Sequence, residues 1–419
     1  MLKFNQPKMK NYLLFLLVIV CFSSATIDIR AQNATTISDS IYSTTLNEHR
    51  NFWVQLPENY NPESKSHYPV VYLLDGLSLK NSLETVYNNY LGHYLPHMIL
   101  VGISNQEHRT RDLTISKIET RRGGPINDET GGADNFTSFI EKELIPFIDK
   151  NYKTTPYRTL IGHSYAGLFT INTLINHKYL FSNYIAIDPS IEWDNQNLLK
   201  QAKAKLGSEN YKGKSLFVSL AAEMVHMWNE EITIENVMDD SSEFALFARS
   251  IIDFSNFAET KKQNGLNFSW KVYPEDLHGT VPLPSMRDGL IFLFEWYQFK
   301  HPQEYNNPKT SVKEIEVLLE NQAKIYLEHF GYTVPPMIEE LFNAYGYMNL
   351  QMQFPEKSLL FFKKGIQYYP ESAGTYDAMA DYFEAQNDFT NALKYAEKAF
   401  EISGNEYHKG RITTFKSKL

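Results

Sequence analysis

The stretch RTLIGHSYAGLFT, residues 158–170, places a serine between two kinds of secondary structure. Residues 159–161 form a short β-branched and leucine run typical of a buried strand, and residues 166–171 form an apolar run typical of a helix. Ser164 therefore lies at a strand-to-helix turn, with Gly162 and Ala166 as small neighbours. This is a relaxed G-x-S-x-G pattern, in which small neighbours let strand and helix crowd around a strained serine.

Two interpretations of Ser164 are open on the motif alone. The serine is either a nucleophile on a sharp turn or the N-cap of the following helix, a position that serine favours in any case. The rest of the chain has to decide between them.

Composition sets the class of protein. The chain has 419 residues, of which 43% are hydrophobic and 14% aromatic, enough for a large core and for two domains. The net charge of −9 and the absence of a basic cluster with interleaved aromatics argue against a nucleic-acid partner.

The N-terminus predicts export. Three lysines precede the apolar run YLLFLLVIVCFSSA (residues 12–25), which has secretory length and is short for a membrane span. We expect a signal peptide at residues 1–31, cut after Ala31 or alternatively after Ala25, and a periplasmic or extracellular mature protein without stable membrane insertion. The bulky residues before Cys21 argue against a lipoprotein anchor there, and removal of the segment leaves no cysteine.

Strand-like and helical runs alternate from about residue 38 to residue 300. Short apolar runs occur at 51–57, 68–76, 98–104, 158–164, 184–190, 215–223 and 268–276, and residues 135–152 have helical spacing. This alternation predicts a mostly parallel sheet with helices on both faces, and sites in such sheets form at the carboxyl ends of the strands.

Candidate catalytic groups follow those strand ends. Glu223 ends the run at 215–223, and His278 follows the last run. The chain order Ser164, Glu223, His278 is the nucleophile, acid, histidine order of α/β-hydrolases. A serine hydroxyl is a weak nucleophile, so His278 would accept its proton and Glu223 would orient the imidazole. Alternative acids lie nearby, at Asp188, Glu192, Glu230, Glu231, Asp239 and Asp240.

Backbone donors are expected to complete the site. The N–H of Tyr165, the residue after the nucleophile, and an N–H at Gly76 or Leu77 would bind the oxyanion. The Asp-Gly pair at 75–76 could equally be a simple turn. His163 is expected to be structural, because adjacent side chains on such a turn diverge.

Six ordered blocks resemble a known family. They are YPVVYLLDG, VGISNQEHRTRDLT, GGADNFTSFIEKELIPFIDKNY, IGHSYAGLF, DPSIEWDN and LHGTVPLPSMRDGL, and they cover residues 68–294. This segment resembles the α/β-hydrolase family described as "putative esterase", which includes esterase D and the enterobactin-type siderophore esterases. The resemblance implies Ser164 as nucleophile and His278 as base. The family usually has Gly at the position of Ala166, and some relatives work with a Ser and His pair alone.

Two substrate contacts are expected beside the nucleophile. The resemblance implies an aromatic substrate wall at Trp193, where the family often has a second aromatic and this chain has Glu192. Arg109 opens the motif RTRD (residues 109–112), which follows the run at 98–104. Arg109 would face an anionic part of the substrate, or the charges of the motif would pair with one another and hold the loop.

A second, all-α region follows a polar linker at residues 301–310. A shift of 34 residues pairs small residues between 346 and 404, which resembles the tetratricopeptide repeat. We therefore expect a helical repeat domain at 311–419 that caps the hydrolase domain, self-associates or binds a protein partner.

No metal or cofactor motif is present in the sequence. The sequence thus predicts a cofactor-free, secreted serine esterase that hydrolyses carboxylic esters of siderophores or other acylated small molecules. The alternative is a catalytically weak scaffold in which the repeats recruit a partner.

Overall fold

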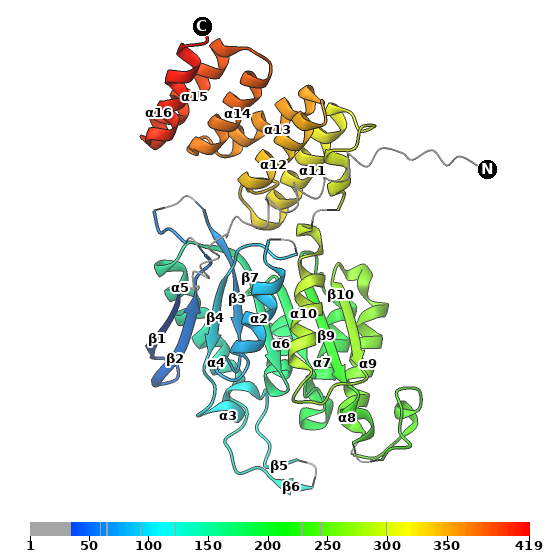
Figure 1. Ribbon diagram of the computed structural model, residues 1–419. Coiled ribbons are helices and arrows are strands. Elements are labelled where there is room, and N and C mark those ends of the chain that lie inside the picture. Colours follow the sequence, from blue (N-terminus) through cyan, green and yellow to red (C-terminus); the bar gives the residue numbers. More distant parts are fainter. Residues whose placement is uncertain are drawn as a thin grey trace, which may run out of the picture.

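A computed structural model describes residues 35–419, apart from Asn59, Ser64, Lys65, His93, Arg122, Trp228, Phe244 and Phe299. The expected signal peptide at residues 1–31, with Cys21, lies outside the described residues. Figure 1 shows a sheet flanked by helices at one end of the molecule and a group of helices at the other.

An eight-stranded sheet in the order β1-β2-β4-β3-β7-β8-β9-β10 forms the centre of the first unit. Strands β1 and β2 are antiparallel to their neighbours, and the other six are parallel to one another. The mostly parallel sheet predicted from the sequence is confirmed. The strands are β1 Thr36–Ser43, β2 Glu48–Gln55, β3 Tyr68–Leu73, β4 Ile99–Ile103, β7 Thr154–His163, β8 Asn183–Ile187, β9 Ser215–Ala221 and β10 Asn267–Tyr273, and a separate hairpin is formed by β5 Thr120–Arg121 and β6 Gly124–Pro125.

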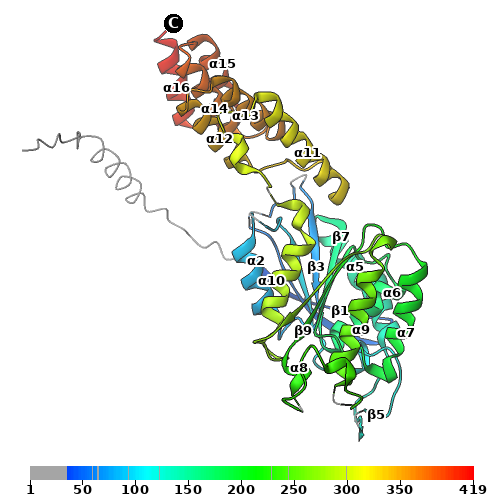
Figure 2. The ribbon, with the colours of Figure 1, turned by 90° about the vertical axis from the view of Figure 1, so that its right-hand side faces the viewer.

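Helices cover both faces of this sheet, as Figure 2 shows. Helices α2 and α10 pack together on one face, and α5, α6, α7 and α9 lie on the other. Two-sided cover explains why the central strands are apolar along their whole length, since all five residues of β4 and of β8 are buried. The helices are α2 Lys80–Tyr90, α3 Arg109–Leu113, α4 Ala133–Phe139, α5 Ile145–Asn151, α6 Tyr165–Asn176, α7 Trp193–Ser208, α8 Glu223–His226, α9 Leu246–Thr260 and α10 Pro282–Leu293.

The second unit is all-helical, as expected. Its helices are α11 Val312–Phe330, α12 Glu339–Gln351, α13 Pro355–Tyr368, α14 Ala373–Ala385, α15 Phe389–Ser403 and α16 Glu406–Lys416. Helices α14 and α15 begin 34 residues after α12 and α13, respectively, so the expected spacing is present in the helix bounds. Gly346 is needed for the approach of α12 and α13, because a Cβ there would lie 2.3 Å from the Phe362 ring. Assignment to the tetratricopeptide class stays a prediction.

The segment predicted as a linker, residues 301–310, packs on these helices. Tyr305 is only 4% exposed and stacks edge-on against Phe361, and its carbonyl accepts a hydrogen bond from Asn349 at 3.0 Å. Lys357 also donates to the carbonyl of Asn307 at 2.6 Å. The polar composition of residues 301–310 predicted a linker. The contact with the helices was not predicted because it depends on one buried aromatic side chain, Tyr305.

Candidate active site

The turn that carries Ser164 joins β7 to α6. Ser164 has φ 61° and ψ −116°, a left-handed backbone conformation that is strained for a residue with a side chain. A Cβ on Gly162 would lie 2.2 Å from the carbonyl oxygen of Ala166, so only glycine fits there. The small neighbours noted in the sequence thus let β7 and α6 cross closely and project Ser164 from the turn. Its Oγ lies 3.5 Å from the Oγ of Ser190.

A buried carboxylate holds the imidazole of His278. The Nδ1 atom of His278 lies 2.5 Å from Oδ2 of Asp188, which directly follows β8 and is fully buried. The other carboxylate oxygen accepts a hydrogen bond from the backbone N–H of Ala221 at 3.0 Å. Burial raises the pKa of Asp188, and the contact with His278 opposes that rise. Asp188 is therefore placed to orient the imidazole and to stabilise its charged form.

The prediction that Glu223 contacts the imidazole is wrong. The Oε2 atom of Glu223 accepts a hydrogen bond from the backbone N–H of His278 at 2.7 Å, so it holds the loop and not the ring. Strand β8 lies next to β7 in the sheet, whereas β9 is one position further away. The side chain at the end of the nearer strand reaches the ring. Chain order allowed both residues, and only the fold of the loops separates them.

Two backbone N–H groups are free to bind an oxyanion. Among the described residues, the N–H groups of Tyr165 and Leu77 have no hydrogen-bond acceptor. The N–H of Gly76 donates to the carbonyl of Ile103 at 2.8 Å, so the proposal of Gly76 as a donor is wrong. A Cβ on Gly76 would lie 2.4 Å from the backbone of Gly102, which makes its role one of close packing against β4.

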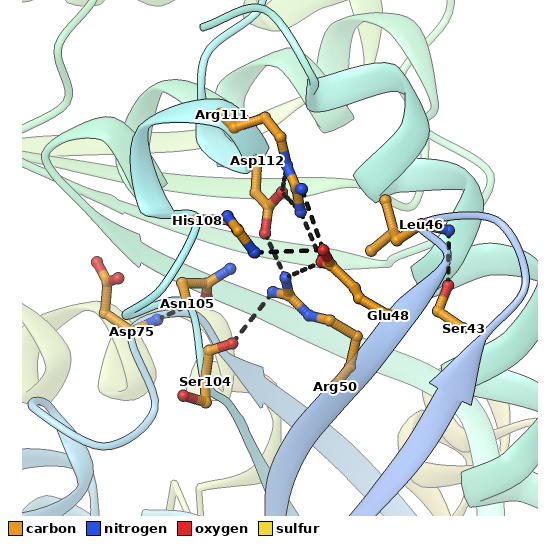
Figure 3. Close-up of polar contacts among 10 residues, drawn as sticks. All are labelled: Ser43, Leu46, Glu48, Arg50, Asp75, Ser104, Asn105, His108, Arg111 and Asp112. Carbon is orange, nitrogen blue, oxygen red and sulfur yellow. Dashed lines mark hydrogen bonds and ion pairs between the residues drawn. The ribbon is translucent and has the colours of Figure 1, made fainter. Parts of the chain in front are cut away.

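Neighbouring loops fix the turn that presents Leu77. The indole N–H of Trp53 donates to the carbonyl of Gly76 at 2.7 Å, and the N–H of Asp75 donates to Oδ1 of the buried Asn105 at 3.2 Å. Figure 3 shows Asn105 between Asp75 and a group of charged side chains on β2 and α3.

That charged group ties the segment after β4 to β2, the second strand from the edge of the sheet. Arg50 contacts Glu48 at 2.9 Å and the fully buried Asp112 at 2.7 Å, and Arg111 contacts Glu48 at 2.6 Å and Asp112 at 2.8 Å. Burial opposes ionisation of Glu48, but hydrogen bonds from the two arginines outweigh it and lower its pKa to about 2. These ion pairs therefore stabilise the loop that carries Asn105 and the helix α3 that begins at Arg109.

Arg109 is paired and does not offer a free charge to substrate. Its guanidinium makes hydrogen bonds of 2.8 to 3.0 Å to the Asp75 carboxylate and donates to the carbonyl of His163 at 3.2 Å. Arg109 therefore has a structural contact, but its partner is Asp75 and not a charge within residues 109–112. The arginine nevertheless lines a cleft of 490 Å³ beside the nucleophile turn, together with Asp75, Leu77, Ser78, Leu79, Asn105, Gln106 and His163.

Trp193 is a packing residue and not a substrate wall. Its side chain is 1% exposed, packs edge-on against Tyr165 with ring centroids 5.2 Å apart, and donates to the carbonyl of Ser116 at 3.3 Å. The sequence analysis missed Arg121, which pairs with Glu192, donates to the hydroxyl of Tyr165 at 2.6 Å and lies over the Trp193 ring. The sequence signal for Arg121 was Glu192, an acidic residue at a position where the family often has an aromatic residue.

His163 lies closer to the site than its expected divergence from Ser164 suggests. Its ring centroid is 4.5 Å from that of His278. Burial lowers the pKa of His163 to about 3, and the neighbouring His278 and Arg109 add to the effect, so the ring is neutral near pH 7. Among the described residues, His163, Asp188 and His278 form the one group of three or more side chains able to hold a metal ion, with ligand atoms within 4.8 Å of one another.

Part of the chain is similar in sequence to known proteins. Residues 43–246 match the family described as "Putative esterase". Ferri-bacillibactin esterase BesA from Bacillus subtilis is 31% identical over 191 residues, which cover 42% of this chain and 66% of that protein. A siderophore enterobactin esterase from Emericella nidulans is 27% identical over 191 residues, covering 41% of this chain and 59% of that protein. The chain thus spans less than two thirds of the length of these relatives.

Solved structures share the fold. An IroE-like serine hydrolase from Shewanella oneidensis superposes with a TM-score of 0.64 at 27% identity, covering 80% of this chain and 100% of that one. An uncharacterised protein from Capnocytophaga ochracea gives a TM-score of 0.60 at 19% identity and covers 91% of this chain, a share that extends into the C-terminal helices. The resemblance to the putative esterase family and the α/β-hydrolase fold are confirmed. Among the helices of the described residues, none combines the length and apolar character that a bilayer crossing requires.

Proposed function

We propose that this protein is a serine hydrolase that cleaves carboxylic esters through an acyl-enzyme on Ser164. The observation that carries the proposal is the strained turn of Ser164 at the end of β7, beside an Asp188–His278 pair at the same edge of the sheet. An N-cap serine has no need of a left-handed backbone, because an N-cap takes extended dihedrals. A nucleophile elbow does need it.

The reaction follows from these groups. The Oγ of Ser164 attacks the ester carbonyl carbon while Nε2 of His278 takes the hydroxyl proton, and Asp188 stabilises the imidazolium through Nδ1. The tetrahedral intermediate expels the alcohol, which receives the proton from Nε2. Water then attacks the acyl-enzyme and gives a proton to the same nitrogen. The second tetrahedral intermediate collapses to the acid as Nε2 returns that proton to Oγ of Ser164.

The developing oxyanion would be bound by the N–H groups of Tyr165 and Leu77. Preorganised donors of this kind are commonly worth about 3 to 4 kcal/mol of transition-state stabilisation each. Leu77 is held for this role by the contacts that Trp53 and Asn105 make to the two preceding residues.

The proposed substrates are esters of acylated small molecules, with siderophore esters as the first class to test. The relatives named above act on siderophores by their descriptions. The cleft beside His163 has room for part of such a substrate, and its side chains from Asn105 and Gln106 offer amide groups for hydrogen bonds.

Export of the mature protein after removal of residues 1–31, a hydrolase domain at 32–300 and a partner for the helices at 311–419 remain proposals. The intact serine, imidazole and carboxylate favour hydrolysis over the alternative in which the helical repeats recruit a partner and the first unit is a scaffold.

The test is fluorophosphonate labelling together with hydrolysis of p-nitrophenyl acetate and a panel of ferric siderophores. We expect label on Ser164 in wild type and none in Ser164→Ala. Absence of label and of turnover in folded wild-type protein would refute the proposed function.

A further inference from the structure

Three side chains of different segments converge beside the nucleophile in a way that hydrolysis alone does not explain. His163 ends β7, Asp188 follows β8, and His278 lies in the loop after β10. Their nitrogen and oxygen atoms lie within 4.8 Å of one another, and Nδ1 of His278 is 2.5 Å from Asp188. A Ser-His-Asp mechanism uses only the last two.

His163 supplies an independent observation. Its Nε2 atom is buried and has no hydrogen-bond partner among the described residues. Leaving a buried polar atom without a partner is unfavourable, so a ligand at this nitrogen would recover a cost that the unliganded fold bears. The centroids of the two imidazole rings lie 4.5 Å apart with a tilt of 42°, so the rings are in contact with each other.

We propose that His163, Asp188 and His278 bind one Zn²⁺ ion and that this ion inhibits the enzyme reversibly, an inference that rests on the proposed function for its effect on catalysis. Two imidazoles and a carboxylate are a donor set that zinc takes, with an open fourth position for water. Bonds of about 2.1 Å place tetrahedral ligand atoms roughly 3.4 Å apart. The widest separation here must therefore shorten by up to roughly 1.4 Å, and the 2.5 Å contact between His278 and Asp188 must lengthen by roughly 0.9 Å as zinc replaces the proton between them. Asp188 is fully buried and held by the N–H of Ala221, so rotation of the two imidazole side chains must supply both movements.

Inhibition follows from the position of the proton on His278. In the resting enzyme Nδ1 carries the proton that faces Asp188, and Nε2 is the free base. Zinc bound at Nδ1 and at the carboxylate moves that proton to Nε2, with no net release. The imidazole then has no lone pair for the Ser164 proton, so turnover stops.

The choice of metal is part of the proposal. Imidazole nitrogen suits Zn²⁺ and related transition ions, whereas Mg²⁺ and Ca²⁺ prefer sites made of oxygen atoms alone. We therefore expect zinc to inhibit at concentrations at which magnesium and calcium have no effect, and a chelator to restore activity.

Binding is tested first without any use of activity, by titration calorimetry of the full chain with zinc chloride. Ser164→Ala should bind one zinc ion per chain. Adding His163→Phe, which keeps a ring of similar size but removes both nitrogens, should weaken binding by about 100-fold or more. His163→Asn is the second variant should the phenylalanine fail to fold. His108→Gln is the matched control, because His108 pairs with Glu48 at 3.3 Å outside the cluster and should leave zinc affinity unchanged.

Hydrolysis of p-nitrophenyl acetate then tests inhibition. Zinc should abolish wild-type turnover, EDTA should restore it, and the residual turnover of His163→Phe should resist zinc. Zinc affinity or inhibition that is the same in His163→Phe as in wild type would overturn the proposal, as would the absence of saturable binding by Ser164→Ala. If no ester is hydrolysed by wild type, the proposed function fails, and calorimetry still decides the metal site.

Discussion

The variants Asp188→Asn and Glu223→Gln distinguish the roles of two carboxylates that both contact His278. Asparagine at position 188 keeps an oxygen for the N–H of Ala221 but turns an amide N–H toward Nδ1. Nδ1 must then accept that hydrogen, which leaves the proton on Nε2 and the base in the wrong tautomer. Loss of this carboxylate in a serine triad commonly lowers turnover by about 10⁴-fold, or about 5.5 kcal/mol.

Glu223→Gln leaves the geometry of the loop intact. The glutamine carbonyl still accepts the hydrogen bond that the carboxylate of Glu223 receives from the backbone N–H of His278 at 2.7 Å. Only the charge assistance is lost, about 1 kcal/mol, so turnover should fall by about fivefold. Glu223 is in this sense a positioning residue.

Stability gives a second readout for the pair. Burial raises the pKa of Asp188, so its folded-state pKa lies above the unfolded value and ionisation at neutral pH opposes folding. Asparagine removes that cost. We expect Asp188→Asn to keep or raise the wild-type melting temperature at pH 7 while losing activity.

The measurements are kcat for p-nitrophenyl acetate, its pH profile, and thermal unfolding of each variant. A Glu223→Gln enzyme that is impaired more than Asp188→Asn would refute the assignment of Asp188. Turnover near wild type in both variants would mean that Ser164 and His278 work as a pair without an acid.

Three further predictions follow from the same contacts. Ser164→Ala should lower turnover by about 10³ to 10⁶-fold with little change in melting temperature, and retention of most activity would end the serine mechanism. Glu48→Gln should lower the free energy of unfolding by about 2 kcal/mol at pH 7, because the folded-state pKa of Glu48 is lowered from 4.5 to about 2. Its stabilisation is present above pH 4.5 and is lost toward pH 2, so in urea unfolding the difference from wild type should shrink across that window, and a constant difference would contradict the charge argument. Trp296→Ala should cost about 2 kcal/mol or more of stability, while folded protein still reacts with fluorophosphonate at Ser164; loss of labelling in folded protein would show that the helical unit shapes the site.

The sequence predicted the elements of the site better than their contacts. The turn of Ser164 could be predicted because its backbone conformation needs small residues at fixed positions around the serine, and Gly162 is such a residue. The place of His278 in the site could be predicted because this histidine follows the last strand of the sheet. Both features are predicted from neighbouring residues in the sequence, and both are present in the folded structure.

The errors concern groups whose partners lie far along the chain. Glu223 and Asp188 each lie at the end of a strand. Asp188 contacts the ring of His278, whereas Glu223 accepts a hydrogen bond from the backbone N–H of His278. Gly76 was proposed as a donor, but its N–H is used by Ile103 on a neighbouring strand. Trp193 and Arg109 are residue types that often bind substrate. In the fold, however, Trp193 is buried and Arg109 pairs with Asp75. Both properties come from tertiary packing, which the spacing of residues in the sequence does not predict.

The position of the helical unit argues that it acts on stability and not on the reaction. It joins the hydrolase unit through aromatic side chains of α11, where His329 stacks on Trp296 with centroids 4.0 Å apart and Tyr157 packs edge-on against Phe330. Tyr157 lies near the start of β7, seven residues before Ser164, so at about 3.3 Å per residue the junction is roughly 23 Å from the nucleophile. Figure 1 places the helices at that end of the sheet, opposite the end where β7 meets α6. Any influence of the helices on turnover must therefore pass through the strand itself, and β7 is buried along most of its length and paired on both sides, which leaves it little freedom to transmit a change.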